Sequence, residues 1–245
     1  MSGAMKIEKG MIAERVVVVG DPARAKIVAS HMKDMKLVAQ NREYSTYTGT
    51  YNGVPVTVAS HGIGGGGASM CFEELIQCGA KVIIRAGTCG SFQPHLREAA
   101  LIIATGAVRS DGVTDRLVPK SFPAVADFEI TKALKDTLTK AKESDKDLVF
   151  DVGLCATEGP FYDGPLGNQN KLWQEAKVLA VEMEVAVLYV IATIRGVRAG
   201  AILNTDNYIF ERMESGKYDP HRDIVKKGTE KMCKLVLDAI ATVVV

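Results

Sequence analysis

Cysteine and histidine are scarce in this 245-residue sequence, and their placement excludes two kinds of small scaffold. The five cysteines are an odd number without a Cys-x-x-Cys pair, and the four histidines stand far apart. This pattern excludes a disulfide framework and a zinc site, so no metal is expected. Long apolar runs are also missing. The longest extends only from Val185 to Ala192, whereas a membrane span needs roughly 18 residues, so no membrane partner is expected.

A strong charge of either sign is missing too. The 30 Lys and Arg residues nearly balance the 29 Asp and Glu residues, which gives a formal net charge of +1. A near-neutral chain lacks the electrostatic footprint of a protein that binds a nucleic-acid backbone, so no nucleic-acid partner is expected. The first residues contain no apolar stretch of the kind found in signal peptides. We therefore expect a cytoplasmic protein with reduced thiols.

The residues that are present indicate a globular α/β protein. Hydrophobic residues make up 47% and charged residues 24% of the chain, close to the average of globular proteins. Buried-type strands are predicted at residues 15–19, 81–85, 100–108, 148–155 and 198–205. Helices are predicted at 23–32, 68–78, 129–142, 182–195 and 221–241. This alternation predicts a single α/β domain over residues 1–245, with helices around a mostly parallel or mixed β-sheet.

Two further features concern turns and loops. Asn52-Gly53 separates two strand-like runs, 44–51 and 54–60, and is the strongest short-range signal for a β-hairpin. The segments 111–123 and 159–169 are rich in Gly, Pro and Asp, and are candidates for lids or pocket walls. Ligands of open α/β sheets gather at the carboxyl ends of the strands, so the residues after each strand are the candidates for a site.

The first two strand ends predict an anion site. Gly20 and Pro22 begin a helix, and Arg24 adds a positive charge to the partial charge of its N-terminus. Arg85 is the last residue of a predicted buried strand and precedes a Gly-Thr turn that contains Thr88. The end of a buried strand is an unusual place for an arginine without a partner. A solvated Arg24 and a structural ion pair at Arg85 are the alternatives.

The glycine-rich segment from Gly62 to Gly67 contains the Gly-x-Gly-x-x-Gly pattern of a dinucleotide site. The acidic residue that such a site needs about 20 positions later is missing, and no Gly-Lys-Ser/Thr follows any glycine cluster. A Walker-type phosphate loop is excluded. An NAD(P)-dependent oxidoreductase remains as an alternative, supported only by the Gly-x-Gly-x-x-Gly pattern without its acidic residue.

Three carboxylates are further candidates. Glu182 and Glu184 stand at the start of an apolar predicted helix, either as partners of its dipole or as acceptors for the two neighbouring hydroxyls of a ribose. Asp206 follows the last predicted strand, either as a turn or N-cap residue or as a general acid.

Six short motifs occur in one order between Gly20 and Asn207: GDPxR, NREY, SHGIG, RAGTCGS, VEMEVA and TDN. In this combination the chain resembles the hexameric nucleoside phosphorylase family. The resemblance implies a single α/β domain with a central mixed sheet and assembly as a homohexamer, a trimer of dimers. It also implies nucleoside and inorganic phosphate as substrates, with no cofactor.

The resemblance assigns roles to individual residues. Those that look like phosphate ligands are Gly20, Arg24, Arg85, Thr88 and, donated by the neighbouring subunit, Arg42. Those that look like ribose contacts are Glu182, Met183 and Glu184. Those expected to line the base site are Cys89, Gly90, Val181 and the stacking aromatic Phe161. Asp206 matches the acid that protonates the purine.

Two departures from the family pattern bear on the substrate. Ala4 stands where family members usually carry a histidine that reaches the ribose 5′ hydroxyl of the adjacent subunit. Residues 162–166 lack the Gln and Arg with which uridine phosphorylases read the pyrimidine, so a purine nucleoside phosphorylase that serves purine salvage is expected. Because Asn168 and Gln169 lie close by in the sequence, uridine phosphorylase remains an alternative. Methylthioadenosine phosphorylase and a non-catalytic nucleoside-binding protein are the others.

Overall fold

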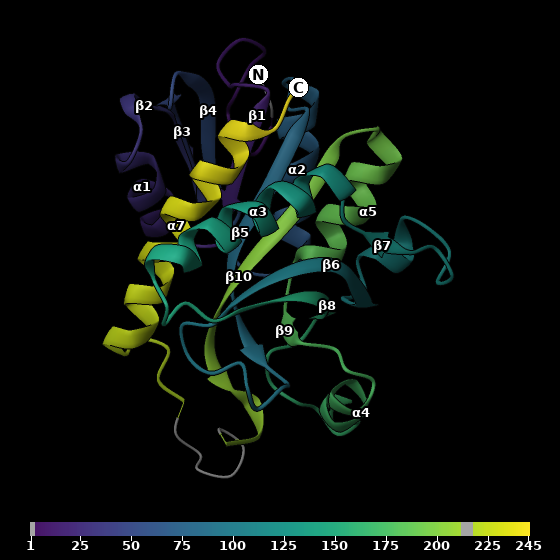
Figure 1. The fold of residues 1–245 in the computed structure, drawn as a ribbon. Helices are drawn as coiled ribbons and strands as arrows, with labels where there is room; N and C mark the ends of the chain where they lie inside the picture. The colour runs from purple at the N-terminus through teal and green to yellow at the C-terminus, as the bar shows by residue number, and fades with distance from the viewer. Residues whose placement is uncertain (1–2, 212–217) are drawn as a thin grey trace.

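A ten-stranded mixed sheet forms the centre of the computed structural model, which describes residues 3–211 and 218–245 (Figure 1). Its strands are β1 (Arg15–Val19), β2 (Lys33–Asn41), β3 (Tyr44–Tyr51), β4 (Val54–Ser60), β5 (Val82–Ser91), β6 (Leu101–Ser110), β7 (Ala124–Val125), β8 (Phe150–Glu158), β9 (Ala180–Glu182) and β10 (Arg198–Tyr208). Their order is β10-β6-β8-β9-β5-β1-β4-β3-β2, and β7 pairs with β6. The predicted α/β fold with a mixed sheet is confirmed.

Part of the sheet closes on itself. β10 pairs with β6 on one side and with β5 on the other, so β5, β9, β8, β6 and β10 form a ring. The remaining arm runs from β1 through β4 and β3 to β2. The β3–β4 hairpin predicted from Asn52-Gly53 is confirmed: Tyr51 pairs with Val54, and both turn residues have positive φ angles of 49° and 79°.

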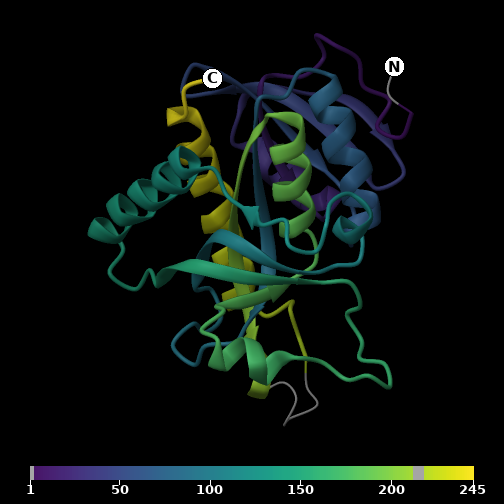
Figure 2. The same ribbon diagram turned by 90° about the vertical axis from the view of Figure 1, so that its right-hand side faces the viewer.

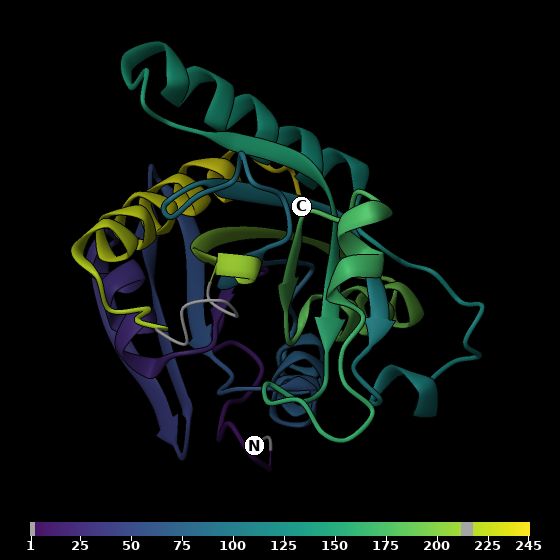
Figure 3. The ribbon, with the colours of Figure 1, turned by 90° about the horizontal axis from the view of Figure 1, so that it is seen from below.

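Helices cover both faces of the sheet (Figure 3). On one face lie α1 (Pro22–Ser30), α3 (Phe128–Ser144) and α7 (Asp223–Thr242), and on the other lie α2 (Gly65–Gln77) and α5 (Val185–Arg195). The four valines of β1 alternate between the two apolar cores: Val16 and Val18 pack with α2 and α5, and Val17 and Val19 with the other helices. This double coverage explains why β1 is apolar without interruption.

The two chain ends lie at one end of the molecule, and the short helix α4 (Asn170–Glu175) lies at the opposite end (Figures 1 and 2). Among the described helices, none has both the length and the apolar character that a bilayer crossing would require.

Three predicted boundaries are wrong. β5 continues past Arg85 to Ser91, so Thr88 lies in a strand and not in a turn. β10 continues to Tyr208, which places Asp206 inside a strand. The helix predicted from residue 182 begins at Val185, because Glu182 ends β9. Pairing with strands on both sides extends β5 and β10 through residues of low strand propensity, an effect that local patterns do not reveal.

Candidate functional site

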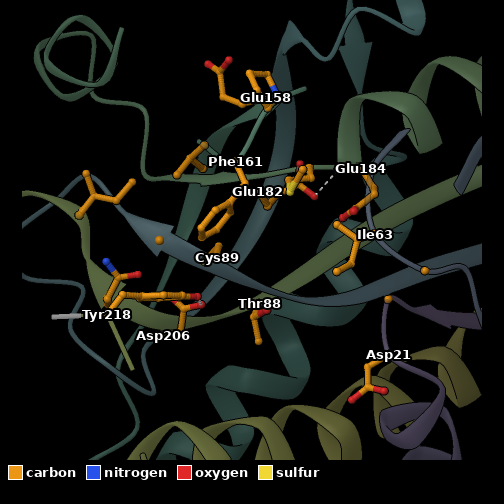
Figure 4. Close-up of a pocket in the computed structure, with 18 of the residues that line it drawn as sticks. Asp21, Ile63, Thr88, Cys89, Glu158, Phe161, Glu182, Glu184, Asp206 and Tyr218 are labelled. Carbon is orange, nitrogen blue, oxygen red and sulfur yellow. Dashed lines mark hydrogen bonds between the residues drawn. The ribbon is translucent and has the colours of Figure 1, made fainter. Parts of the chain in front are cut away.

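One cavity of about 790 Å³ contains the predicted site (Figure 4). It opens at the carboxyl ends of β1 and β4, beside the second halves of β5 and β10, as the strand-end rule predicts. The structure brings together all the predicted site residues except one along its lining: Gly20, Arg24, Arg85, Thr88, Cys89, Gly90, Phe161, Val181, Glu182, Met183, Glu184 and Asp206. The exception is Arg42, which is exposed in the turn between β2 and β3.

Arg85 is buried in the middle of β5 and is held by three side chains. Its Nε donates to Glu182 Oε2 at 3.1 Å, and its Nη1 lies 3.0 Å from His61 Nε2. Its Nη2 forms an ion pair with Glu184. Burial alone would lower the pKa of this guanidinium, but the two carboxylates outweigh burial and raise it. Arg85 therefore stays positively charged inside the fold.

Glu182 is fixed by structural partners. Its carboxylate accepts hydrogen bonds from Thr157 Oγ1 at 2.6 Å and from the backbone N–H groups of Glu184 and Val185 at 2.8 and 3.0 Å. These amides belong to the unsatisfied N-terminus of α5, so Glu182 caps that helix from the preceding strand. Because its oxygens already hold Arg85 and the helix, Glu182 orients the site more than it offers free acceptors to a ligand.

Glu184 differs because it faces the glycine-rich loop. Its Oε1 accepts a hydrogen bond from Gly64 N at 2.5 Å, and its other oxygen contacts Arg85. Burial raises the pKa of Glu184, and the nearby Arg85 only partly offsets this effect. The glycine-rich loop therefore contacts the Glu184 carboxylate through Gly64, the residue before α2.

Gly20 and Arg24 lie next to this loop. A Cβ atom at Gly20 would lie 3.1 Å from the Gly62 carbonyl oxygen, so glycine lets the two loops pack together. Asp21 Oδ1 caps α1 by accepting from Ala23 N at 2.8 Å. Arg24 has no hydrogen bond or ion pair with any other described residue, and burial lowers its pKa. An unpaired guanidinium of this kind is suited to bind an anion.

Asp206 is buried at the opposite side of the cavity from Glu184 (Figure 4). The pairing between β10 and β5 slips between Thr205 and Asn207, so Asp206 is the extra residue of a β-bulge, a device that redirects a side chain. Tyr218 Oη donates a hydrogen bond to Asp206 Oδ2 at 2.8 Å. The Tyr218 ring also packs against Phe161, with ring centroids 5.8 Å apart.

Apolar or small residues line the part of the cavity between Asp206 and Glu184. Cys89 and Gly90 lie on β5, and Val181 lies on β9, where it pairs with Gly90. Burial raises the pKa of the Cys89 thiol well above its usual range, so Cys89 is a neutral wall residue. The partly exposed Phe161 ring lies above it (Figure 4). These wall residues lie between Asp206 and Glu184 (Figure 4).

Two predicted pocket walls turn out differently. The 159–169 loop lines the cavity through Pro160, Phe161, Asp163, Gly167 and Asn168. No residue of the 111–123 loop does so; Arg109 instead ties that loop down, with hydrogen bonds to the carbonyls of Pro119 and Phe122 at 2.7 Å. Within the described residues, no group of histidine, cysteine and acidic side chains forms a metal-binding cluster.

The sequence did not identify several residues that shape the site. His61, fully buried directly after β4, contacts Arg85; it belongs to the SHGIG motif, which gave it no role. Tyr218 had no local signal, since only the fold brings it to Asp206. Among the described residues, the lining also contains seven carboxylates, those of Asp21, Glu43, Glu158, Asp163, Glu182, Glu184 and Asp206, against two guanidiniums, those of Arg24 and Arg85.

Comparisons with known proteins show the family of this chain. A family model described as the phosphorylase superfamily matches residues 14–241. The purine nucleoside phosphorylase of Plasmodium falciparum is 39% identical over 242 residues, which cover 97% of this chain and 94% of the relative. The uridine phosphorylase of Treponema pallidum is 39% identical over 202 residues, covering 78% and 76%. The crystal structure of the Toxoplasma gondii purine nucleoside phosphorylase in complex with immucillin-H has a TM-score of 0.92 and 32% identity, covering 98% of this chain and 95% of that one.

Proposed function

This chain belongs to the phosphorylase superfamily, and from that premise we propose that it cleaves the N-glycosidic bond of purine nucleosides with inorganic phosphate. The products are the free base and ribose 1-phosphate or its deoxy form. The observation that carries the proposal is the distribution of charge in one cavity. Arg85 forms an ion pair with Glu184, Arg24 lines the same cavity, and Asp206 lies on the opposite side of the cavity from Glu184 (Figure 4).

The proposed reaction follows from that distribution. When the glycosidic bond breaks, positive charge develops on the sugar and the bonding electron pair leaves with the base. A phosphate dianion held by the guanidiniums stabilises the sugar cation and then forms the new bond to C1′. Glu184 accepts hydrogen bonds from the ribose hydroxyls, and Asp206 donates a proton to the purine N7, so that the base leaves as a neutral molecule.

Inorganic phosphate is the co-substrate in this proposal, and no cofactor is required. The negative charge of the nucleophile is balanced by Arg24, Arg85 and the neighbouring subunit's copy of Arg42, and charge-assisted hydrogen bonds from guanidiniums suit an oxyanion. The proposed assembly is a homohexamer built as a trimer of dimers, which would bring each Arg42 to another chain's cavity.

The base is proposed to be a purine because of the cavity wall formed by the 159–169 loop. The loop brings neither an arginine nor a glutamine into the described cavity, whereas Asp206 lines it and is the group proposed to act on a purine nitrogen. Uridine phosphorylase is the second candidate. The uridine phosphorylase of Treponema pallidum has the same 39% identity as the purine nucleoside phosphorylase of Plasmodium falciparum, and Asn168 lines the cavity.

A substrate panel tests the proposal. Inosine, guanosine, adenosine, methylthioadenosine and uridine are each incubated with the protein, with and without phosphate, and base release is measured. We expect phosphate-dependent release from at least one purine nucleoside and slower release from uridine. Faster cleavage of uridine would favour the second candidate. Release that does not need phosphate, or nucleoside binding without turnover, would overturn phosphorolysis, and tight NAD(P) binding would point to an oxidoreductase.

A further inference from the structure

The position of the Arg85 guanidinium depends on its partners more than on its own backbone. The side chain starts in the middle of a strand and folds back over Gly87, where a Cβ atom would lie only 2.7 Å from Arg85 Nη2. A long arginine side chain has many rotamers, so a fixed orientation requires contacts that select one of them. Three partners make those contacts: Glu182, Glu184 and His61.

These three partners are not equivalent. Glu184 lines the cavity and is proposed to bind ribose, so its contact with Arg85 is open to exchange when ligands bind. Glu182 is fixed by Thr157 and the start of α5. His61 is fully buried, does not line the cavity and packs edge to face on Phe72, with ring centroids 5.5 Å apart. Glu182 and His61 are therefore the permanent supports of Arg85.

The chemistry of His61 suits the acceptor role. Burial lowers the pKa of its imidazole well below the usual value, and the positive charge of Arg85 lowers it further, so the ring is neutral. A guanidinium has only donors, and Arg85 Nη1 can therefore approach Nε2 at 3.0 Å only if Nε2 is the unprotonated nitrogen. The proton of the ring is then on Nδ1.

His61 also contacts the end of β1 and the Gly20 loop, the other predicted part of the anion site. Its backbone N–H donates to the Val19 carbonyl at 2.9 Å, which ties the end of β4 to the end of β1. A Cβ atom at Gly20 would lie 3.8 Å from His61 Cε1. The same imidazole thus supports Arg85 by a hydrogen bond and borders the Gly20 loop by contact.

We propose that His61 is a positioning residue for phosphate: its Nε2 fixes the Nη1 edge of Arg85, so that the donors not used by His61, Glu182 and Glu184 face the anion. His61 acts through Arg85 and does not touch the phosphate. This inference rests on the proposed function, because it assigns the support of the same phosphate site. Of the five N–H donors of a guanidinium, three are used by these side chains and two remain for a ligand.

The test compares two substitutions at this position. His61→Leu removes the acceptor, whereas His61→Gln keeps an acceptor oxygen near the position of Nε2. Phe72→Leu is the matched control, because it removes the ring contact with His61 but leaves the hydrogen bond to Arg85. Binding of inorganic phosphate alone is measured by calorimetry, the KM values for phosphate and inosine by kinetics, and folding by circular dichroism.

We expect His61→Leu to weaken phosphate binding about 10- to 100-fold, the range for losing a hydrogen bond to a charged group, with the KM for inosine changed by less than about twofold. His61→Gln should recover most of the phosphate affinity, and Phe72→Leu should retain it. If His61→Leu does not fold, His61→Asn takes its place, because asparagine is too short to reach Arg85 Nη1.

Three results would overturn the proposal: unchanged phosphate affinity in His61→Leu, equal losses in His61→Leu and His61→Gln, or an equal loss in Phe72→Leu. If the unmodified protein binds no phosphate, the proposed function fails together with this inference. If the unmodified protein binds phosphate and cleaves inosine but His61→Leu does the same, only the inference fails.

Discussion

At the scale of single residues, Asp206 is the group proposed to protonate the leaving base. It is buried at a β-bulge and accepts a hydrogen bond from Tyr218. Asp206→Asn should lower kcat for inosine about 10²–10⁴-fold, because the purine would leave unprotonated. The comparison substrate is 7-methylinosine, whose base already carries a positive charge and needs no proton at N7. Equal losses on both substrates would contradict an acid role for Asp206.

Glu184 should give nucleoside binding a dependence on pH. Burial raises its pKa, and only the ionised carboxylate can accept hydrogen bonds from both ribose hydroxyls. As the pH falls through this raised pKa, Glu184 becomes protonated and inosine binding should weaken at a pH above the usual titration range of glutamate. Calorimetry of inosine binding without phosphate checks this expectation. Glu184→Gln should bind inosine weakly at every pH; a remaining acid-side decrease in that variant would assign the titration to another group.

At the scale of whole elements, a substitution in α3 should change stability without changing activity, because this helix lies away from the cavity. Asp127 caps this helix through a 3.0 Å hydrogen bond from Ile130 N to its Oδ1, and no residue of α3 lines the cavity. Asp127→Ala should lower the free energy of unfolding by about 1 kcal/mol, a decrease in Tm of roughly 2–4 °C, with unchanged kcat. Asp136→Ala is the matched control, because Asp136 is exposed on the same helix and makes only a surface ion pair with Lys132. Similar losses in the two variants would contradict a capping effect.

The elements also explain how much the sequence could predict. The apolar run of β1 and the Asn52-Gly53 turn are local signals, and both predictions are confirmed. The strand β2 was missed because it lies at the exposed edge of the sheet and carries several charged side chains, which hide any alternation. The extension of β5 depends on its partners β10 and β9, which are far away in the sequence.

The candidate site follows the same division. Arg85 was recognisable because a charge inside a buried strand needs a partner, and the structure shows that carboxylates and His61 supply it. The order of the motifs identified Glu184 and Asp206 as candidates. It did not predict how far they lie from each other or from Arg24. The contact between Tyr218 and Asp206 could not be predicted, since it depends on where the chain returns after β10.

At the scale of the whole molecule, the described lining of the cavity in one chain carries more negative than positive charge. It contains the two guanidiniums of Arg24 and Arg85 against seven carboxylates, and carboxylates repel an anion. Arg42 is exposed, and the preceding Asn41 donates from Nδ2 to the Ala4 carbonyl at 2.8 Å. The segments that contain positions 4 and 42, both expected to act across a subunit interface, are thus joined within the same chain, with Ala4 buried and Arg42 exposed.

This arrangement predicts that two inactive variants can restore each other. Arg42→Ala should be unable to complete its neighbour's site, and Arg85→Ala should be unable to use its own. When the two variants are refolded together, an Arg42→Ala chain receives an intact Arg42 from an Arg85→Ala partner, so about a quarter of the sites become complete if dimers form at random. Phosphorolysis of inosine measures the recovery. In the control mixture, Arg85→Ala with Asp206→Asn, each chain carries one defect inside its own cavity, so the mixture should stay inactive. No recovery in the test mixture would show that Arg42 serves the chain that carries it or no site at all, and recovery in the control would show that Arg85 or Asp206 also acts across chains.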